Sequence, residues 1–294
     1  MTFFVSVFCA AVCLTGAQQQ FTYENNGAEN WPLEFPTCGG DRQSPIDVNR
    51  VTPADLGPFQ FHNYHLPADI TVTNMGHTAQ ATLNMGTPPT LTGGGLRAKY
   101  VLDQLHFHSG SEHTYEGTRY PMEMHMVHHN IKFRNFTEAV ASGEEDAVAV
   151  LAFFFEVTHH PNLAWDNLVR ALAHVKEPET SQQVFPPTPL CLWLPQDLSR
   201  FYRYYGSLTT PTCDQVVVWT LFSNDIPISH HQIATIGAAK VTSLFFLTNQ
   251  FVVQLQLEQW RHLKTPTGNK QTNTFRPAQL RNGREILFNQ GWWS

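Results

Sequence analysis

Short runs rich in valine, phenylalanine, threonine and tyrosine recur along the chain, separated by glycine, proline and asparagine. Hydrophobic and polar side chains alternate in these runs with a period near two, which is typical of β-strands. The pattern predicts strands at 70–73, 101–108, 122–127, 147–157 and 215–222. We therefore expect a mostly β fold, built on a mixed, largely antiparallel twisted sheet with a few short helices.

One segment has helical periodicity instead. Leucine and valine side chains form an apolar stripe over 163–175, directly after Pro161-Asn162, and this predicts a helix. No internal repeat, low-complexity stretch or change in composition marks a linker. The sequence after an N-terminal leader, 18–294, is therefore expected to form a single domain.

The leader is an apolar run at 1–17 that ends in Thr-Gly-Ala before a glutamine stretch. It is shorter than the roughly 18 residues that a membrane span requires, which disfavours the alternative of an N-terminal anchor. We interpret it as a signal peptide cleaved after Ala17, and expect a secreted, extracellular protein without a membrane span. Cleavage leaves Cys38, Cys191 and Cys213, enough for one disulfide and one odd thiol. Asn135 begins an Asn-Phe-Thr sequon for N-glycosylation.

The charge of the chain argues against nucleic acid as a partner. Charged residues make up 14% of the chain, and the net charge of −6 is not opposed by any basic cluster. Because nucleic-acid binding requires a concentrated positive surface, we expect no nucleic-acid partner.

Three histidines occupy alternate positions on two of the predicted strands. His106 and His108 follow Gln104, and His125 follows Glu123, each at a spacing of two. Residues two apart share one face of a strand, so each pair or trio projects to one side. Three neutral imidazoles leave the fourth tetrahedral position of a zinc ion open, as in catalytic zinc sites. Gln104 and Glu123 are placed to accept the second N–H group of a ligand imidazole.

A cupin metalloenzyme is the main alternative reading of these residues. Its first motif also begins with His-x-His and adds a glutamate, which Glu112 nearly supplies. Glu112 would then be a ligand, and the metal would be iron or manganese with oxygenase or isomerase chemistry. The Pro-x-Gly that precedes the later cupin histidine is absent before His125.

The motifs as a set resemble the alpha-class carbonic anhydrases of the secreted type, from about residue 23 to 277. The matching blocks, in order, are Gln43-Ser-Pro-Ile46, Asn74-Met-Gly-His77, Gln104-Leu-His-Phe-His108, Ser111-Glu-His113, Glu123-Met-His125, Gly206-Ser-Leu-Thr-Thr-Pro211 with Trp219, and Phe275-Arg-Pro277.

The resemblance implies a function and the roles of several residues. The three histidines would bind zinc, which lowers the pKa of bound water to about 7. Zinc-bound hydroxide would attack carbon dioxide, giving bicarbonate and a proton. Thr209 would orient the hydroxide by donating a hydrogen bond to Glu112, and Thr210 would lie next to the substrate. Sulfonamides and small anions are the expected inhibitors.

Further residues take roles from the same resemblance. His77 would accept the proton, because release to water at about 10²–10³ s⁻¹ is too slow for a turnover near 10⁶ s⁻¹. Cys38 and Cys213 would form the disulfide, leaving Cys191 either buried or available for an intermolecular bridge. The apolar wall beside carbon dioxide would be formed by Val127, Val150, Leu208, Val217 and Trp219.

Some features depart from the family pattern. Ser109 stands where the family usually has tryptophan, and the loop between Gly110 and Glu112 is shorter than usual. The interval 233–272 is about twice its usual length, with the excess near 237–257. A retained short intron is our hypothesis, and a real inserted loop is the alternative. If translated, the excess is expected to displace the Phe275-Arg-Pro277 block. A catalytically silent binding or matrix protein is a second functional alternative, although such proteins usually lose a ligand histidine.

Overall fold

The computed structural model of the chain describes a defined set of residues, namely Phe21, Tyr23, 27–237, 263–264, 270–271 and 274–291. The predicted signal peptide at 1–17 lies outside the described residues. So does the predicted insertion at 237–257, apart from its first residue. Both therefore stay predictions.

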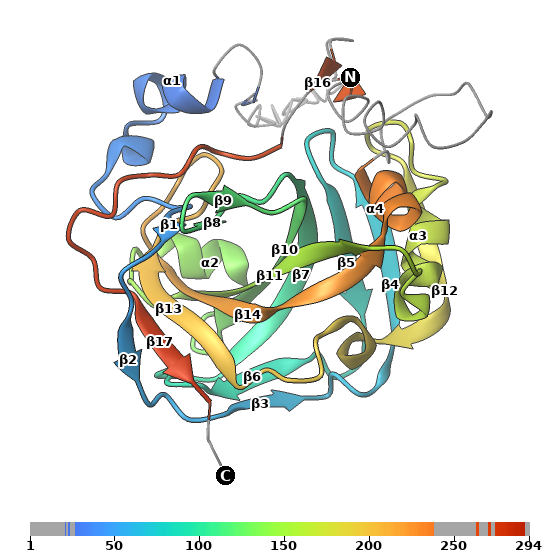
Figure 1. Cartoon of the computed structure of the whole chain (residues 1–294), viewed down its shortest axis with the longest axis horizontal. Coiled ribbons are helices and arrows are strands. Elements are labelled where there is room, and N and C mark those ends of the chain that lie inside the picture. Colours follow the sequence, from blue (N-terminus) through green and yellow to red (C-terminus); the bar gives the residue numbers. More distant parts are fainter. Residues whose placement is uncertain are drawn as a thin grey trace, which may run out of the picture.

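One large twisted sheet organises the molecule (Figure 1). Its strands follow the order β12 (Ser181–Pro189), β4 (Pro67–Asn74), β5 (Ala79–Asn84), β7 (Tyr100–Ser109), β10 (Met122–Asn130), β11 (Val148–Thr158), β14 (Val217–Ser229), β13 (Arg200–Gly206), β17 (Leu287–Gln290) and β2 (Thr52–Ala54). β6 (Thr90–Gly93) pairs with β7, and β3 (Phe59–His62) pairs with β6. Most pairs are antiparallel, whereas β11–β14 and β17–β2 are parallel.

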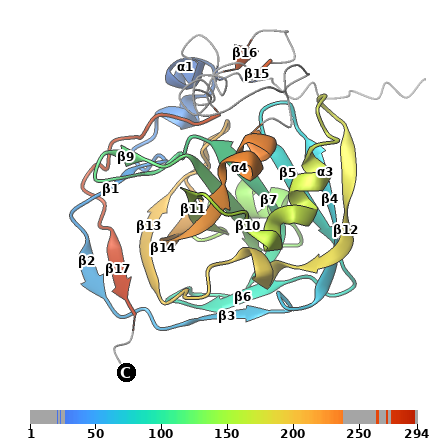
Figure 2. The ribbon, with the colours of Figure 1, turned by 45° about the vertical axis from the view of Figure 1, so that its right-hand side comes forward.

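Shorter elements surround this sheet. Two small sheets consist of β1 (Asp47–Val48), β8 (Thr114–Tyr115) and β9 (Thr118–Arg119), and of β15 (Leu263–Lys264) and β16 (Lys270–Gln271). The helices are α1 (Gly27–Glu34), α2 (Phe136–Ala141), α3 (Asp166–Leu172) and α4 (His230–Gly237), with 3₁₀ turns η1 (Pro36–Gly39), η2 (Leu163–Trp165) and η3 (Leu190–Trp193). α3 and α4 lie side by side near the β12 edge of the sheet (Figure 2).

The central strand β10 is buried on both of its faces, at all nine positions. Met122, Met124 and Met126 point into the larger apolar core, which also contains alternate residues of β11. Glu123 and His125 point to the opposite face of the sheet, because side chains alternate along a strand. The same period of two therefore gives a hydrophobic core on one side and a polar centre on the other.

The predicted fold class is confirmed, and most predicted strands lie within observed ones. β14 begins at Val217 and continues to Ser229, beyond the expected end at 222. The segment predicted as one helix over 163–175 begins instead as the 3₁₀ turn η2, continues as α3 and ends at Leu172.

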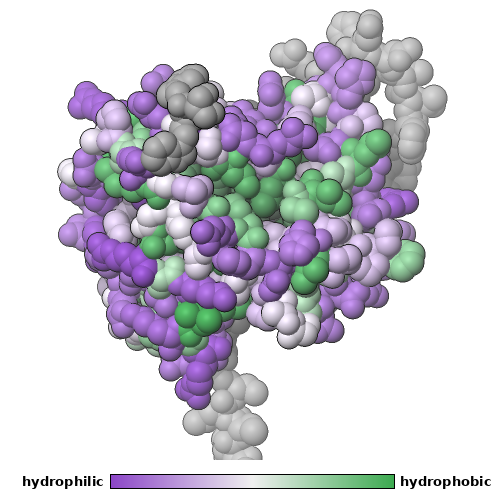
Figure 3. Space-filling model, turned by 90° about the horizontal axis from the view of Figure 1, so that it is seen from below, coloured by the Kyte–Doolittle hydropathy of each residue, from purple (hydrophilic) through white to green (hydrophobic). Residues whose placement is uncertain are grey.

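The surface mixes polar and apolar side chains. On the face seen from below, hydrophobic side chains gather toward the middle with hydrophilic ones around them (Figure 3). The most exposed large hydrophobic residues come from separate segments and include Leu33, Leu163, Phe185 and Leu280. Within the part of the chain that the structure describes, none of the helices has the length and apolar character needed to cross a bilayer.

Candidate metal centre

The antiparallel register of β7 and β10 brings the three predicted ligands together. His106 lies opposite His125, and His108 lies opposite Glu123. The ring centroids of His106, His108 and His125 are 4.7 to 5.2 Å apart. One nitrogen of each ring lies within 4.8 Å of the others, so the three could surround a single ion.

The outer nitrogen of each imidazole faces an oxygen acceptor. His106 Nδ1 is 2.9 Å from Gln104 Oε1, His108 Nδ1 is 2.6 Å from the Thr274 carbonyl, and His125 Nε2 is 2.7 Å from Glu123 Oε1. A carbonyl or carboxylate oxygen only accepts, so each outer nitrogen carries the proton. The unprotonated nitrogens, Nε2, Nε2 and Nδ1, are left for the centre of the trio.

Two buried atoms in the centre have no hydrogen-bond partner among the described residues: Nε2 of His108 and Oε2 of Glu112. They lie 3.4 Å apart. Burial, followed by repulsion from the other two rings, holds the pKa of His106 well below its ordinary value, and burial also lowers that of His125. Three imidazole nitrogens that converge from two strands are a donor set that zinc takes, so the residues present fit this ion.

The Glu123 carboxylate accepts hydrogen bonds from two histidines. Besides His125, its carboxylate accepts hydrogen bonds from Nδ1 of His113 at 2.7 Å and from the His113 backbone N–H at 2.8 Å. Burial alone would raise the pKa of Glu123, but His113 and His125 lower it well below the ordinary value. The other ring nitrogen of His113 is 2.6 Å from the Tyr204 hydroxyl. Glu123, His113 and His125 could also form a metal group by distance, but hydrogen bonds already occupy their facing atoms.

Glu112 lies in the loop after β7, whereas Thr209 and Thr210 are consecutive residues between β13 and β14. Glu112 is fully buried, and its Oε1 accepts a hydrogen bond from the Arg276 backbone N–H at 2.9 Å. Thr209 is buried and Thr210 half-buried. Within the described residues, no hydrogen bond joins Thr209 to Glu112; the free carboxylate oxygen faces His108 instead.

The five predicted wall residues share one apolar cluster. Val127, Val150, Val217 and Trp219 are buried in it, and the half-buried Leu208 packs against it. The Trp219 ring lies 4.9 Å from the His125 ring, which places the cluster directly beside the histidine trio.

His77 lies in the turn after β4 and is half-buried. It is close enough to His106 to contribute to the lowered pKa of that ring. Its own ring is 4.9 Å from the ring of Phe21, which in turn contacts Tyr23 and Trp31.

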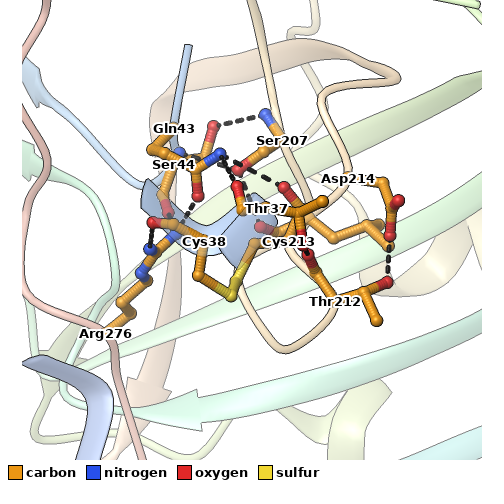
Figure 4. Close-up of a disulfide and its surroundings, with 10 residues drawn as sticks. Thr37, Cys38, Gln43, Ser44, Ser207, Thr212, Cys213, Asp214 and Arg276 are labelled. Atoms are coloured by element: carbon orange, nitrogen blue, oxygen red, sulfur yellow. Dashed lines mark hydrogen bonds between the residues drawn. A yellow bond between two sulfur atoms is a disulfide. The ribbon is translucent and has the colours of Figure 1, made fainter. Parts of the chain in front are cut away.

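The predicted disulfide is confirmed: Cys38 and Cys213 are bonded, with a separation of 175 residues in the chain (Figure 4). Gln43 Nε2 donates to the Cys213 carbonyl, and the buried Arg276 side chain donates to the Cys38 carbonyl at 2.7 Å. Because Cys213 lies just after Thr209, the disulfide fixes the threonine segment. Cys191 is unpaired and exposed, so its expected alternative as a buried thiol is wrong.

The block at Phe275-Arg-Pro277 is in place beside the centre, so its expected displacement is wrong. It follows Thr274, whose carbonyl accepts from His108 and whose hydroxyl accepts from the Ser109 backbone N–H at 2.9 Å. Asn135 of the sequon is exposed, and its side-chain oxygen caps α2 by accepting from the Glu138 N–H at 2.9 Å.

Four residues that support the centre were assigned no role from the sequence: His113, Tyr204, Thr274 and Arg276. The adjacent sequence Ser-Glu-His gave one available signal, since His113 directly follows Glu112. Thr274 and Arg276 contact residues more than 160 positions earlier in the chain, and no local pattern reveals such contacts.

The structure is thus that of a β-protein whose mixed sheet presents three converging imidazoles from neighbouring strands, a group that could hold a metal ion. A family model described as eukaryotic-type carbonic anhydrase matches residues 26–290. Similar proteins include human carbonic anhydrase 6 (33% identical over 246 residues, 77% of this chain and 78% of the relative) and human carbonic anhydrase 12 (32% over 275 residues, 88% and 70%). Rabbit (Oryctolagus cuniculus) carbonic anhydrase 4 is 37% identical over 229 residues, 73% of this chain and 71% of the relative.

The chain belongs to the eukaryotic-type carbonic anhydrase family. The resemblance read from the sequence is thereby confirmed, and the cupin alternative is wrong.

Proposed function

We propose that this protein is a zinc-dependent carbonic anhydrase that converts carbon dioxide and water reversibly to bicarbonate and a proton. One observation carries the proposal: three buried or half-buried imidazoles turn unprotonated nitrogens toward one point while acceptors hold their outer nitrogens. Family membership supports the same reaction.

Zinc in such a site supplies a coordinated water with a pKa near 7 and a positive charge for the developing anion. His106, His108 and His125 would hold it. Their acceptors Gln104 and Glu123, together with the Thr274 carbonyl, fix the tautomer and direction of each ring. Partners of this kind raise metal affinity and ligand basicity.

Thr209 and Glu112 would orient the attacking water. Oε1 of Glu112 is occupied by the Arg276 N–H, so Oε2 is the oxygen left for a hydroxyl donor. A Thr209 hydroxyl that donates its only proton to Oε2 can offer the reacting oxygen nothing but lone pairs. A lone pair of that oxygen then points toward carbon dioxide, which Thr210 would adjoin.

Carbon dioxide is apolar and needs a dry surface near the reacting oxygen. The cluster of Val127, Val150, Val217 and Trp219, with Leu208 at its edge, lies beside His125 and offers such a surface. Sulfonamides and small anions would compete at the same centre.

His77 would carry away the proton. A histidine titrates close to neutral pH and so can accept a proton and return it to buffer. We expect His77→Ala to lower kcat far more than kcat/KM, with imidazole buffer restoring kcat. An unchanged kcat in dilute buffer would remove His77 from the mechanism.

We also propose that the protein is secreted, after loss of residues 1–17, and glycosylated at Asn135. The Cys38–Cys213 disulfide supports an oxidising compartment. The exposed Asn135 uses its oxygen for the helix cap, which leaves the amide nitrogen for a glycan.

Elemental analysis combined with stopped-flow carbon dioxide hydration tests the function. We expect one zinc per chain, turnover that a sulfonamide abolishes, and loss of both zinc and turnover in His125→Ala. His62→Ala, which changes an exposed histidine on β3, is the matched control and should leave both unchanged. Stoichiometric zinc without turnover would indicate the silent binding protein instead, and absence of zinc would refute the proposal.

A further inference from the structure

The segment at 274–276 supports two groups of the centre at once. The Thr274 carbonyl accepts from His108 Nδ1 at 2.6 Å, and the Arg276 backbone N–H donates to Glu112 at 2.9 Å. Phe275 lies between these two residues in the chain. A shift of Phe275 therefore moves a partner of a proposed ligand and a partner of the proposed orienting carboxylate together.

The Phe275 ring lies close to the backbone of Gly110. A Cβ atom added to Gly110 would lie only 2.8 Å from the ring, and Gly110 has a φ of +72°, a region that favours glycine.

The Arg119 guanidinium covers the Phe275 ring. Its central carbon lies 3.7 Å from the ring centroid, within the range of a strong cation–π contact. The guanidinium also donates to the carbonyls of Ser111 and Glu112. Burial lowers the pKa of Arg119, while the negative charges of Glu112 and Glu123 oppose that effect.

Arg119 is itself tied to the strand end that carries His108. The Gly110 N–H donates to the Pro121 carbonyl at 2.8 Å, and the Ser111 N–H donates to the Tyr120 carbonyl at 2.9 Å. The residues after the second histidine and those around Arg119 are thus joined through backbone hydrogen bonds as well as through the side chain.

We infer that Arg119 is a positioning residue of the metal centre: with Phe275 it forms a clamp that holds the Thr274 carbonyl against His108 and the Arg276 N–H against Glu112. This inference rests on the proposed zinc site, because it concerns how firmly that site holds its ion.

Zinc dissociation from the full-length protein into excess chelator tests the clamp, with the stability of the metal-free protein measured in parallel. Loss of groups that orient metal ligands typically costs 10–100-fold in metal affinity or activity. We expect Arg119→Leu to accelerate dissociation about 10-fold. Arg119→Lys keeps the charge without the planar face and should lie between Leu and the unchanged protein. Arg134→Leu, which removes an exposed i,i+4 ion pair with Glu138, is the control and should leave the rate unchanged.

Phe275→Leu separates the clamp from a general loss of stability. If the two side chains act as one unit, adding Arg119→Leu to Phe275→Leu should change the dissociation rate less than about twofold. If the two substitutions instead accelerate dissociation independently, so that their effects multiply in the double variant, the inference is overturned. A dissociation rate for Arg119→Leu equal to that of the unchanged protein also overturns it. Should Arg119→Leu not fold, Arg119→Lys decides in the same way. Absence of zinc from the unchanged protein would instead refute the proposed function.

Discussion

Removal of the Cys38–Cys213 disulfide should destabilise the protein more than any other single covalent change. The bond closes a segment of 175 residues. Chain-entropy models assign a loop of this length about 5 kcal/mol of stabilisation, through restriction of the unfolded ensemble. Replacing both cysteines by alanine avoids new free thiols, and the buried hydrogen bonds of Gln43 and Arg276 around the bond are to backbone carbonyls that alanine retains.

Guanidinium unfolding monitored by tryptophan fluorescence measures the effect. With a slope of about 5 kcal/mol per molar, a loss of about 5 kcal/mol lowers the midpoint by roughly 1 M. Cys191→Ala removes an exposed thiol and should leave the midpoint unchanged. A double variant whose midpoint lies within about 0.2 M of the unchanged protein would refute the reasoning, since 0.2 M at this slope is about 1 kcal/mol.

Three further predictions concern single side chains. Glu123→Gln places an amide beside His125 and should weaken zinc binding about 10–100-fold in chelator competition. Burial lowers the pKa of His128 to about 4, whereas the unfolded chain keeps the ordinary value of about 6.5. Because the unfolded state then binds the proton first, the free energy of unfolding should fall by up to about 3 kcal/mol from pH 6.5 to 4. His128→Gln should flatten this pH dependence in urea titrations. Asn135→Ala should lower the free energy of unfolding by about 1 kcal/mol, because it removes the cap of α2. Thr137→Ala abolishes the sequon but keeps the cap, so it should not cause that loss. Unfolding of the two unglycosylated variants measures the difference.

The parts of the structure that were predictable from sequence are those with local periodicity. The spacing of two at His106 and His108, and at Glu123 and His125, predicts that the rings share a face, and the register of β7 and β10 brings them together. The late end of β14 was missed, because 223–229 is mixed in polarity and contains a proline; parallel pairing with β11 extends the strand there.

Contacts between distant segments were not predictable from local patterns. Thr274 and His108 are 166 residues apart in the chain, and the acceptor is a backbone carbonyl, which leaves no trace in residue type. His113 was assigned no role at the site, yet its ring links Glu123 to Tyr204. The disulfide pairing was obtained from family resemblance, since three cysteines alone allow any pair.

The complete burial of β10 has a consequence for how reliably the chain assembles. A slip of one residue against β7 would turn His125 and Glu123 into the methionine-lined side and send thioethers toward the imidazoles. Such a mispaired state would bury a carboxylate in apolar surroundings and would also separate the three histidines of the proposed zinc site. The alternation of methionines with Glu123 and His125 along β10 therefore disfavours mispairing, and only the correct register would assemble the proposed zinc site.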